Sequence, residues 1–264
     1  MSAAGIVSLE IQGHVAIVTL ERPAKLNALT PEMITALGNV ASDLDKRTDL
    51  RAVVLTASGE RAFCVGADIR VWSGLQPLDM WRQWVRDGHR VFDAWANLRL
   101  PVIAAINGHA FGGGLELLAA ADIRVSEPAA TFALPEAGIA TCPGWSGTQR
   151  LVKLIGPSQV KLMALTGRRI DALEAQRVGL VQDISEAGGA LAHALDIAKQ
   201  ISKQAPISVQ LTKQLIDAGT GINVAAVLEG MAGALAATTL DATTTSPRTR
   251  GTRGSAARSA RSRT

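Results

Sequence analysis

The stretch that decides the fold is Asn107–Glu116, NGHAFGGGLE, which joins a buried strand expected over Val102–Ile106 to a helix expected over Leu115–Ala121. Three consecutive glycines leave the turn without Cβ atoms, so the backbone can approach a ligand closely. The first N–H groups of the following helix lack internal partners and lie at the positive end of its dipole. The sequence therefore predicts a turn that can bind an anion, although a packing turn accounts for the glycines equally well.

Two glutamates lie in apolar surroundings close to this turn. Glu116 is in the first turn of the expected helix, and Glu136 follows Pro135 at the end of a strand expected over Thr131–Leu134. Two carboxylates whose surroundings hold their pKa values apart can divide the work of an acid and a base. With backbone donors for an oxyanion beside them, they suit the addition of water to an activated double bond. For either glutamate alone, an ion pair or a solvated turn is the simpler interpretation.

Short apolar strands alternate with helices through the first half of the chain. The expected elements are strands at Val7–Ile11, Val15–Leu20, Arg51–Thr56, Val102–Ile106, Ile123–Ser126 and Thr131–Leu134, and a helix from Thr30 to about Leu44. The first two strands indicate a β-hairpin, and the repeated order predicts an α/β fold with crossover connections. From about Gly147 the chain is mostly helical, with helices beginning at Pro157 and Asp171 and others over Glu186–Gln204 and Pro206–Ala218, then an apolar segment over Ile222–Leu235.

The composition indicates one globular core in a reducing compartment. Of the 264 residues, 47% are hydrophobic, which is enough for one sizeable core. Cys64 and Cys142 stand alone in the sequence, and neither a secretion signal nor an apolar run long enough for a membrane helix is recognisable. We therefore expect a cytoplasmic protein with no disulfide framework, no metal site and no membrane contact.

The C-terminal end has a different composition from the rest. Residues 242–264 contain six arginines and no acidic residue, so the formal charge of +4 belongs to this tail, and residues 1–241 carry −2. A nucleic-acid-binding protein is the alternative function from another class. The tail has no interleaved aromatics and the body no basic motif, so only salt-sensitive, non-specific binding to RNA or DNA is expected.

Three blocks together carry a resemblance to a known family. They are RAFCVGADI at 61–69, NGHAFGGGLE at 107–116 and PEAGIATCPGWSGTQRL at 135–151. In order and spacing they resemble the crotonase (enoyl-CoA hydratase/isomerase) family over roughly residues 6–230, and most closely an enoyl-CoA hydratase. The resemblance implies an α/β, ClpP/crotonase-like fold: a spiral of ββα units followed by a C-terminal α-helical trimerisation region.

This resemblance also divides the chain into three parts. The expected parts are the crotonase spiral core with the active site over 1–195, the helical trimerisation region over 196–240, and a disordered Arg-rich tail over 241–264. The family usually ends in a helical segment with acidic and aromatic residues, which helps to close the coenzyme A site. Here that pattern is lost after about Leu240, and we hypothesise a frameshift; a genuine basic tail is the alternative.

Roles for individual residues follow from the same resemblance. Ala67 and Gly113 match the two backbone N–H donors of an oxyanion hole that holds the thioester oxygen. Glu116 and Glu136 match the glutamates that hold the attacking water, with Glu136 also giving a proton to the α-carbon, and Gly144 matches a backbone group that positions this water. Contacts with coenzyme A are expected from Lys25, Leu26, Ala67, Asp68, Ile69, Arg70 and Gly113.

The implied activity is that of a lyase, an enoyl-CoA hydratase that adds water reversibly to a trans-2-enoyl-CoA, as in fatty-acid β-oxidation. Isomerisation of a 3-enoyl-CoA to a 2-enoyl-CoA is the nearest alternative, and a silent acyl-CoA-binding scaffold is another. The resemblance implies no cofactor, because coenzyme A is part of the substrate. It implies a homotrimer or a hexamer built as a dimer of trimers, with no specific nucleic-acid partner.

Tryptophans near the predicted site are the main departure from the family pattern. Trp145-Ser146 stands where many hydratases have small residues, so Trp145 either narrows the acyl pocket or packs outward. Four more tryptophans lie between the first two blocks, and helical spacing favours core packing for them over a wall or lid of the acyl pocket. They are Trp72, Trp81, Trp84 and Trp95.

Overall fold

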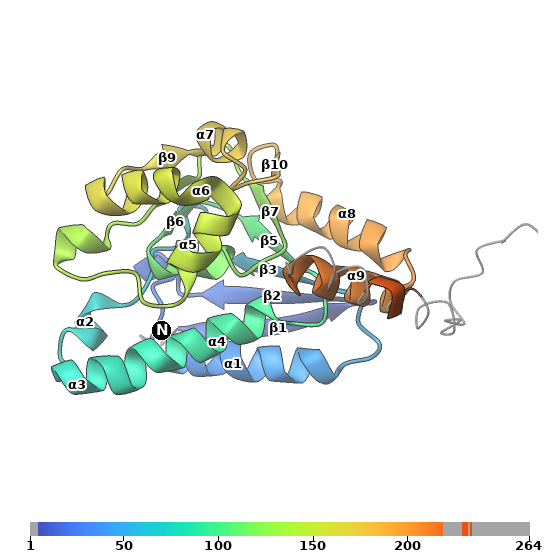
Figure 1. Cartoon of the computed structure of the whole chain (residues 1–264), viewed down its shortest axis with the longest axis horizontal. Helices are drawn as coiled ribbons and strands as arrows, with labels where there is room; N and C mark the ends of the chain where they lie inside the picture. Colours follow the sequence, from blue (N-terminus) through green and yellow to red (C-terminus); the bar gives the residue numbers. More distant parts are fainter. Residues whose placement is uncertain (1–4, 219–228, 232, 234–264) are drawn as a thin grey trace, which may run out of the picture.

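The structure of the chain, a computed structural model, describes residues 5–218, 229–231 and 233 (Figure 1). Its strands form two sheets. The six-stranded sheet has the order β1-β2-β3-β5-β7-β10, and the four-stranded sheet has the order β4-β6-β8-β9. The expected segment 222–235 lies largely, and the tail over 241–264 entirely, outside the described residues.

The larger sheet begins with the predicted hairpin and continues with parallel strands. Its strands are β1 (Ile6–Gln12), β2 (Val15–Glu21), β3 (Ala52–Ala57), β5 (Val102–Ile106), β7 (Ile123–Ser126) and β10 (Asp183–Ile184). β1 pairs with β2 antiparallel, and the remaining neighbours are parallel. Parallel strands need crossover connections, which confirms the predicted α/β class.

β3 and β5 are buried along their whole length because both faces of the sheet are covered. In β3, Ala52 and Val54 pack with the alanines of α8 (Ala190–Ser202), whereas Val53 and Leu55 point into the main core. Since successive side chains point to opposite faces, the strand reads in the sequence as an uninterrupted apolar run.

The smaller sheet contains the second strand of each ββα unit. Its strands are β4 (Ala62–Cys64), β6 (His109–Phe111), β8 (Thr131–Ala133) and β9 (Ile170–Asp171). β3 leads into β4, β5 into β6 and β7 into β8, so the chain passes repeatedly from the larger sheet to the smaller one. β4 and β6 did not stand out in the sequence as strands because each has only three residues and lies within two residues of a glycine.

Helices of the first half enclose the main core on the side of β1 and β2. α1 (Pro31–Lys46) begins as expected: Thr30 Oγ1 accepts the Met33 N–H, and proline occupies the first position. α4 (Arg86–Ala96) packs along α1, and the Trp95 indole N–H donates to the Leu37 carbonyl at 3.1 Å. Short segments precede α4: α2 (Ile69–Trp72), α3 (Pro77–Asp79) and a π-helical turn (Met80–Val85).

The second half is helical, as the sequence indicated, but two boundaries differ. The helices are α6 (Gly147–Thr166), α7 (Ala172–Arg177), α8 and α9 (Pro206–Ala218). The helix expected from Pro157 is the second part of α6, which bends at Gly156, where φ is 77° and the conformation is not helical. α8 begins at Ala190 rather than Glu186 because Gly188 has a φ of 74°.

No helix in the described part of the chain combines the length and the apolar character that a membrane crossing requires.

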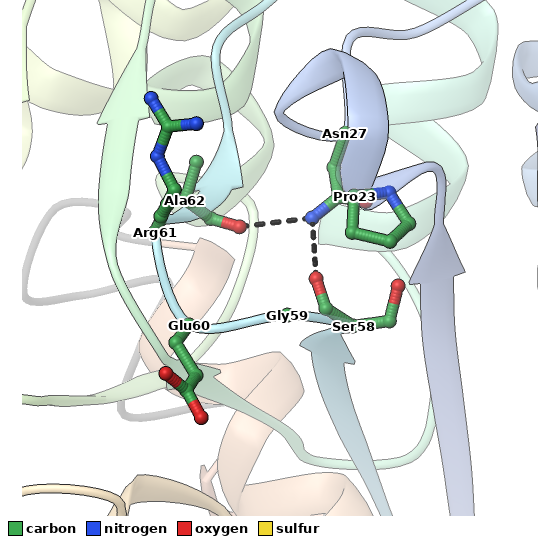
Figure 2. A pocket seen from close by; sticks show the side chains of 7 residues that line it. All are labelled: Pro23, Asn27, Ser58, Gly59, Glu60, Arg61 and Ala62. Atoms are coloured by element: carbon green, nitrogen blue, oxygen red, sulfur yellow. Dashed lines mark hydrogen bonds between the residues drawn. The ribbon is translucent and has the colours of Figure 1, made fainter.

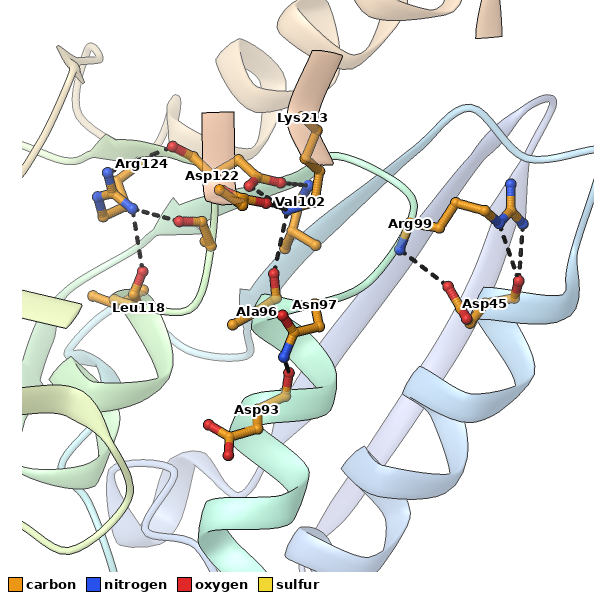
Figure 3. Close-up of polar contacts among 12 residues, drawn as sticks. Asp45, Asp93, Ala96, Asn97, Arg99, Val102, Leu118, Asp122, Arg124 and Lys213 are labelled. Carbon is orange, nitrogen blue, oxygen red and sulfur yellow. Dashed lines mark hydrogen bonds and ion pairs between the residues drawn. The ribbon is translucent and has the colours of Figure 1, made fainter. Parts of the chain in front are cut away.

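A buried ion pair ties α9 to the sheet (Figure 3). The Lys213 ammonium group lies 2.5 Å from Asp122 Oδ1 and 3.4 Å from the carbonyl of Ala96, and the Lys213 side chain is only 8% exposed. The other Asp122 oxygen accepts the N–H of Val102 at 2.7 Å. The Asp122 carboxylate therefore joins α9 to the start of β5, and the Lys213 ammonium group joins α9 to the last residue of α4.

We predict that Lys213→Met lowers the free energy of unfolding by about 3 kcal/mol, because it leaves the Asp122 carboxylate buried without its cation. Urea denaturation of the folded protein measures the change. The matched control is Lys199→Met, since Lys199 and its partner Asp196 are each about two-thirds exposed. That substitution should change the stability by less than about 0.5 kcal/mol. Equal losses for the two variants would contradict the prediction.

Candidate active site

Three loops meet at the ends of the parallel strands of the smaller sheet. β4 leads to Val65–Asp68, β6 to Gly112 and α5 (Gly113–Leu118), and β8 to a 3₁₀ turn (Glu136–Ile139). Parallel strands β4, β6 and β8 end at the same edge, so the three conspicuous sequence blocks converge there.

The first two loops approach each other so closely that only glycine fits. A Cβ on Gly66 would lie 3.1 Å from the nitrogen of Gly113, and the φ of Gly66 is 96°. A backbone bridge from Leu29 to Ala67 holds the first loop, with the Leu29 N–H donating to the Gly66 carbonyl at 2.8 Å. Within the described residues, the N–H groups of Ala67 and Gly113 donate to no other backbone group. Two backbone donors are thus left available on adjacent segments.

Glu116 lies fully inside the protein, with 2% of its surface exposed. Its Oε1 accepts the backbone N–H of Trp145 at 2.9 Å and that of Gly147 at 3.0 Å. A Cβ on Gly147 would lie 2.1 Å from Glu116 Cγ, so this contact requires glycine. Burial raises the pKa of Glu116, while the N–H groups of Trp145, Gly147 and Gly144 oppose that rise.

Glu136 reaches the same place from the third loop. Its Oε1 lies where a Cβ on Gly112 would come within 2.7 Å, so the carboxyl group rests on the glycine turn. Among the described residues, its buried Oε2 has no hydrogen-bond partner. Burial, together with the nearby charge of Glu116, raises the pKa of Glu136 to about 7. The two carboxyl groups therefore lie close together and differ in the number of hydrogen-bond donors around them.

The chain matches one known protein family over most of its length. Residues 10–248 match the model of the family described as Enoyl-CoA hydratase/isomerase. The chain belongs to the enoyl-CoA hydratase/isomerase family. It is 39% identical to a short-chain-enoyl-CoA hydratase of Clostridium acetobutylicum over 81% of both chains. It is 40% identical to an (E)-benzylidenesuccinyl-CoA hydratase of Thauera aromatica over 79% of this chain and 80% of the relative.

Solved structures agree with the fold as well as the family. An enoyl-CoA hydratase from Bacillus anthracis superposes with a TM-score of 0.86 and 34% identity, covering 89% of this chain and 92% of that one. A second, from Streptomyces coelicolor, superposes with a TM-score of 0.84 and 31% identity, covering 89% and 87%. The predicted spiral of ββα units is therefore confirmed as the fold that these hydratases share.

In this member of the hydratase/isomerase family, the loop expected to contact coenzyme A has a fixed shape. Leu26 and Asn27 both have positive φ, of 52° and 55°. The buried Asn27 side chain donates to the carbonyls of Ser58 and Ala62 at 2.9 and 2.8 Å (Figure 2). A pocket of about 330 Å³ lies beside this loop, with the lining residues Pro23, Asn27, Ser58, Gly59, Glu60, Arg61 and Ala62.

The three residues after Ala67 differ in their contacts: the side chain of Asp68 is bonded to other residues, whereas those of Ile69 and Arg70 are exposed. Asp68 pairs with Arg22 at 2.8 Å and also accepts the N–H of Arg70 at 3.1 Å, so its side chain holds the loop in place. Ile69 and Arg70 are exposed on the first turn of α2, and Ile69 retains 51% of its surface. Lys25 is exposed on the facing loop. The two loops thus expose apolar and basic side chains to solvent.

Trp145 packs inward, which resolves one open question from the sequence. Its ring lies 5.1 Å from the ring of Trp84 and 5.1 Å from that of Phe92. Core packing was correctly predicted for Trp84 and Trp95, but it was wrong for Trp81, which is 59% exposed. The side chain of Trp72 is outside the described part of the structure.

Sequence reasoning missed one residue of this family member's site. His89, on α4, contacts the Ser146 hydroxyl through Nδ1, and it lies close enough to Glu116 to oppose slightly the rise in pKa that burial causes there. Ser146, next to Gly147, has a φ of 65°, which is a strained left-handed conformation, and its contact with His89 supports this conformation. His89 belongs to no recognisable sequence motif. The only sequence signal for its position was its spacing of one helical turn before Phe92, which places both on the same face of α4.

We predict that Glu136→Gln becomes more stable than the natural protein as the pH rises. With a folded pKa of about 7 against an ordinary 4.5, the folded state holds the Glu136 proton more tightly than the unfolded state. That stabilisation is complete below pH 4.5 and is lost as the pH passes 7. At pH 8, urea denaturation should show the variant to be more stable by about 2 kcal/mol, since one pKa unit corresponds to about 1.4 kcal/mol and solvent screens part of the shift.

The same substitution on the exposed Glu186 is the control for this pH dependence. Glu186→Gln should leave the difference from the natural protein constant between pH 5 and pH 8. A stability difference for Glu136→Gln that does not grow over this range would contradict the raised pKa.

Proposed function

We propose that the protein is an enoyl-CoA hydratase, a lyase that adds water reversibly to a trans-2-enoyl-CoA and gives a 3-hydroxyacyl-CoA. The observation that carries this proposal is the convergence of two buried carboxylates, Glu116 and Glu136, on the glycine turn that begins α5. Membership of the family and the names of its relatives support the same reaction.

In this proposal the thioester oxygen lies between the N–H groups of Ala67 and Gly113. Neither group has a backbone acceptor of its own among the described residues. Addition of water at C3 transfers electron density to the thioester oxygen, where both donors stabilise the enolate as it forms. Loss of one such donor in other enzymes reduces the rate by about 10²–10³.

The two glutamates divide the proton transfers between them. Glu116, whose carboxylate is held by backbone N–H groups, orients a water molecule and takes its proton as the oxygen bonds to C3. Glu136, whose pKa of about 7 keeps a large fraction protonated near neutral pH, gives its proton to C2. After the addition, Glu136 has lost its proton to C2 of the product and Glu116 has gained one from the water molecule. Proton exchange with solvent restores both groups. The N–H of Gly144, which lies beside Glu116, holds the attacking water molecule in position.

Coenzyme A is bound along the two loops at the opening. The backbone from Ala67 to Arg70 lies along the pantetheine and nucleotide portions, opposite Lys25 and Leu26. Lys25 and Arg70 supply positive charge for the phosphates, and the Arg22–Asp68 pair fixes the shape of the loop that presents them. The reaction itself needs no cofactor, since the thioester already activates the double bond.

The proposed setting is fatty-acid β-oxidation in the cytoplasm. Both cysteines, Cys64 and Cys142, are free thiols, and Cys142 is exposed, which suits a reducing compartment. The domain limits follow the same proposal: the spiral core over 1–195 carries the site, 196–240 mediates trimer formation, and 241–264, outside the described residues, is the Arg-rich tail. Whether the tail results from a frameshift is testable by intact mass and the genomic reading frame.

We predict that Glu116→Gln and Glu136→Gln each reduce kcat for hydration of crotonyl-CoA by about 10²–10⁴, because each removes a proton-transfer group while conserving shape. Loss of absorbance of the conjugated double bond measures the rate. Glu186→Gln is the matched control on the surface and should retain the activity of the natural protein.

Three results would contradict this assignment. If Glu136→Gln hydrates crotonyl-CoA at an unchanged rate, Glu136 is not the proton donor. If the natural protein leaves crotonyl-CoA unchanged but converts a 3-enoyl-CoA to its 2-enoyl isomer, the protein is an isomerase; retention of both glutamates favours the hydratase. If it binds acyl-CoA and turns over neither substrate, it is a scaffold.

The second half of the chain exposes large apolar side chains, which supports assembly as a homotrimer or as a dimer of trimers. Leu165 on α6, Leu173 on α7 and Ile216 on α9 each retain more than 70% of their surface. We predict that light scattering coupled to size-exclusion chromatography gives three or six times the chain mass of 27.6 kDa. A monomer at micromolar concentration would contradict the proposal.

A further inference from the structure

The indole of Trp145 lies against the glycine turn of the candidate active site. A Cβ on Gly113 would come within 2.6 Å of Trp145 Cζ3 and 2.8 Å of its Cε3. The benzene edge of the ring therefore lies directly beside the residue whose N–H is proposed to hold the thioester oxygen. The backbone of the same tryptophan donates its N–H to Glu116. Trp145 thus touches both halves of the site, with its main chain at one carboxylate and its ring at the helix start.

The opposite side of the Trp145 ring packs against α4 at Gly88. A Cβ on Gly88 would lie 2.0 Å from Trp145 Nε1, so the helix has no room for any larger residue at this position. Gly88 in a helix interior costs about 1 kcal/mol relative to alanine. The contact with Trp145 explains its presence, since no other large group competes for this space.

A hydrogen bond fixes the direction of the ring. The indole N–H donates to the carbonyl of Trp84 at 3.2 Å, and Trp84 lies within the π-helical turn Met80–Val85. With Phe92 packed edge-on and only 3% of Trp145 exposed, the ring is enclosed on all sides. In a densely packed interior such a ring cannot turn to another rotamer without displacing its neighbours.

We propose that the Trp145 indole is the closed inner end of the acyl site and restricts the substrate to short acyl groups. This inference rests on the proposed hydratase function. The thioester at Gly113 and the reacting carbons at Glu116 and Glu136 place the far end of the acyl group near the space between α5 and α4. In this chain the ring and the Gly88 contact fill that space, so a longer chain has no room beyond its first few carbons.

The test compares the full-length protein with Trp145→Ala and Trp145→Phe on trans-2-enoyl-CoA substrates of four, six, eight and ten carbons. Both variants keep the backbone N–H at Glu116, and the four-carbon substrate is the internal reference for each variant. The ratio of kcat/KM for the ten-carbon to the four-carbon substrate should rise by about 10-fold or more in Trp145→Ala, and by less in Trp145→Phe. Each methylene accommodated in an apolar pocket changes kcat/KM by about 10-fold or more.

Trp95→Phe is the matched control. Trp95 is a buried tryptophan of α4 whose indole N–H also donates to a backbone carbonyl, but it packs against α1, away from the site. Its substitution should lower the melting temperature without changing the ratio. If Trp145→Ala fails to fold, the more conservative Trp145→Phe carries the test by the same ratio.

Three results separate the possible failures. An unchanged ratio in folded Trp145 variants overturns the inference and leaves the proposed function intact. A natural protein that hydrates the ten-carbon substrate as efficiently as the four-carbon one overturns it as well. A natural protein that hydrates none of the four substrates overturns the proposed function, and the inference with it.

Discussion

A carboxylate enclosed by protein is the constraint on which the rest of the site depends. Removing such a group from water costs several kcal/mol unless donors replace its hydration. For Glu116 the donors come from a loop about thirty residues further along the chain. Its backbone must bend so that neighbouring N–H groups face inward. The left-handed Ser146 beside Gly147 produces this bend, as in the backbone nests that bind anions. The chain therefore closes around its own carboxylate before any substrate is present.

That bend also decides where the side chains of the loop can lie. With the N–H groups facing Glu116, the side chain of Trp145 is directed toward α4 and the start of α5, and the hydroxyl of Ser146 toward His89. Serine in a left-handed conformation is strained by about 1 kcal/mol or more, which its contact with His89 offsets. The packing of the main core and the position of the reactive carboxylate are thus set by one short segment, and a change in either alters the other.

The sequence predicted the fold well where a single physical signal dominated. The continuous apolar runs of β3 and β5 and the Thr30-Pro31 helix start needed no tertiary information. Strands β4 and β6 were not predicted because their pairing is set by neighbours distant in sequence. The convergence of Glu116 and Glu136 could be predicted only from the resemblance. The inward packing of Trp145 depends on the bare Cα of Gly88, 57 residues earlier, which no local pattern can reveal.

The surroundings of the two glutamates satisfy their carboxyl groups differently. Two N–H groups on Glu116 Oε1 oppose the rise in pKa that burial causes, whereas Glu136 Oε2 has no partner among the described residues, and burial raises the pKa of Glu136 to about 7. An unpaired buried acceptor costs about 1–3 kcal/mol, and a fold selected for stability alone would pair it. Here the cost is smaller because a protonated Glu136 buries no charge. In the proposed hydration, this difference leaves Glu136 to release a proton and Glu116 to accept one.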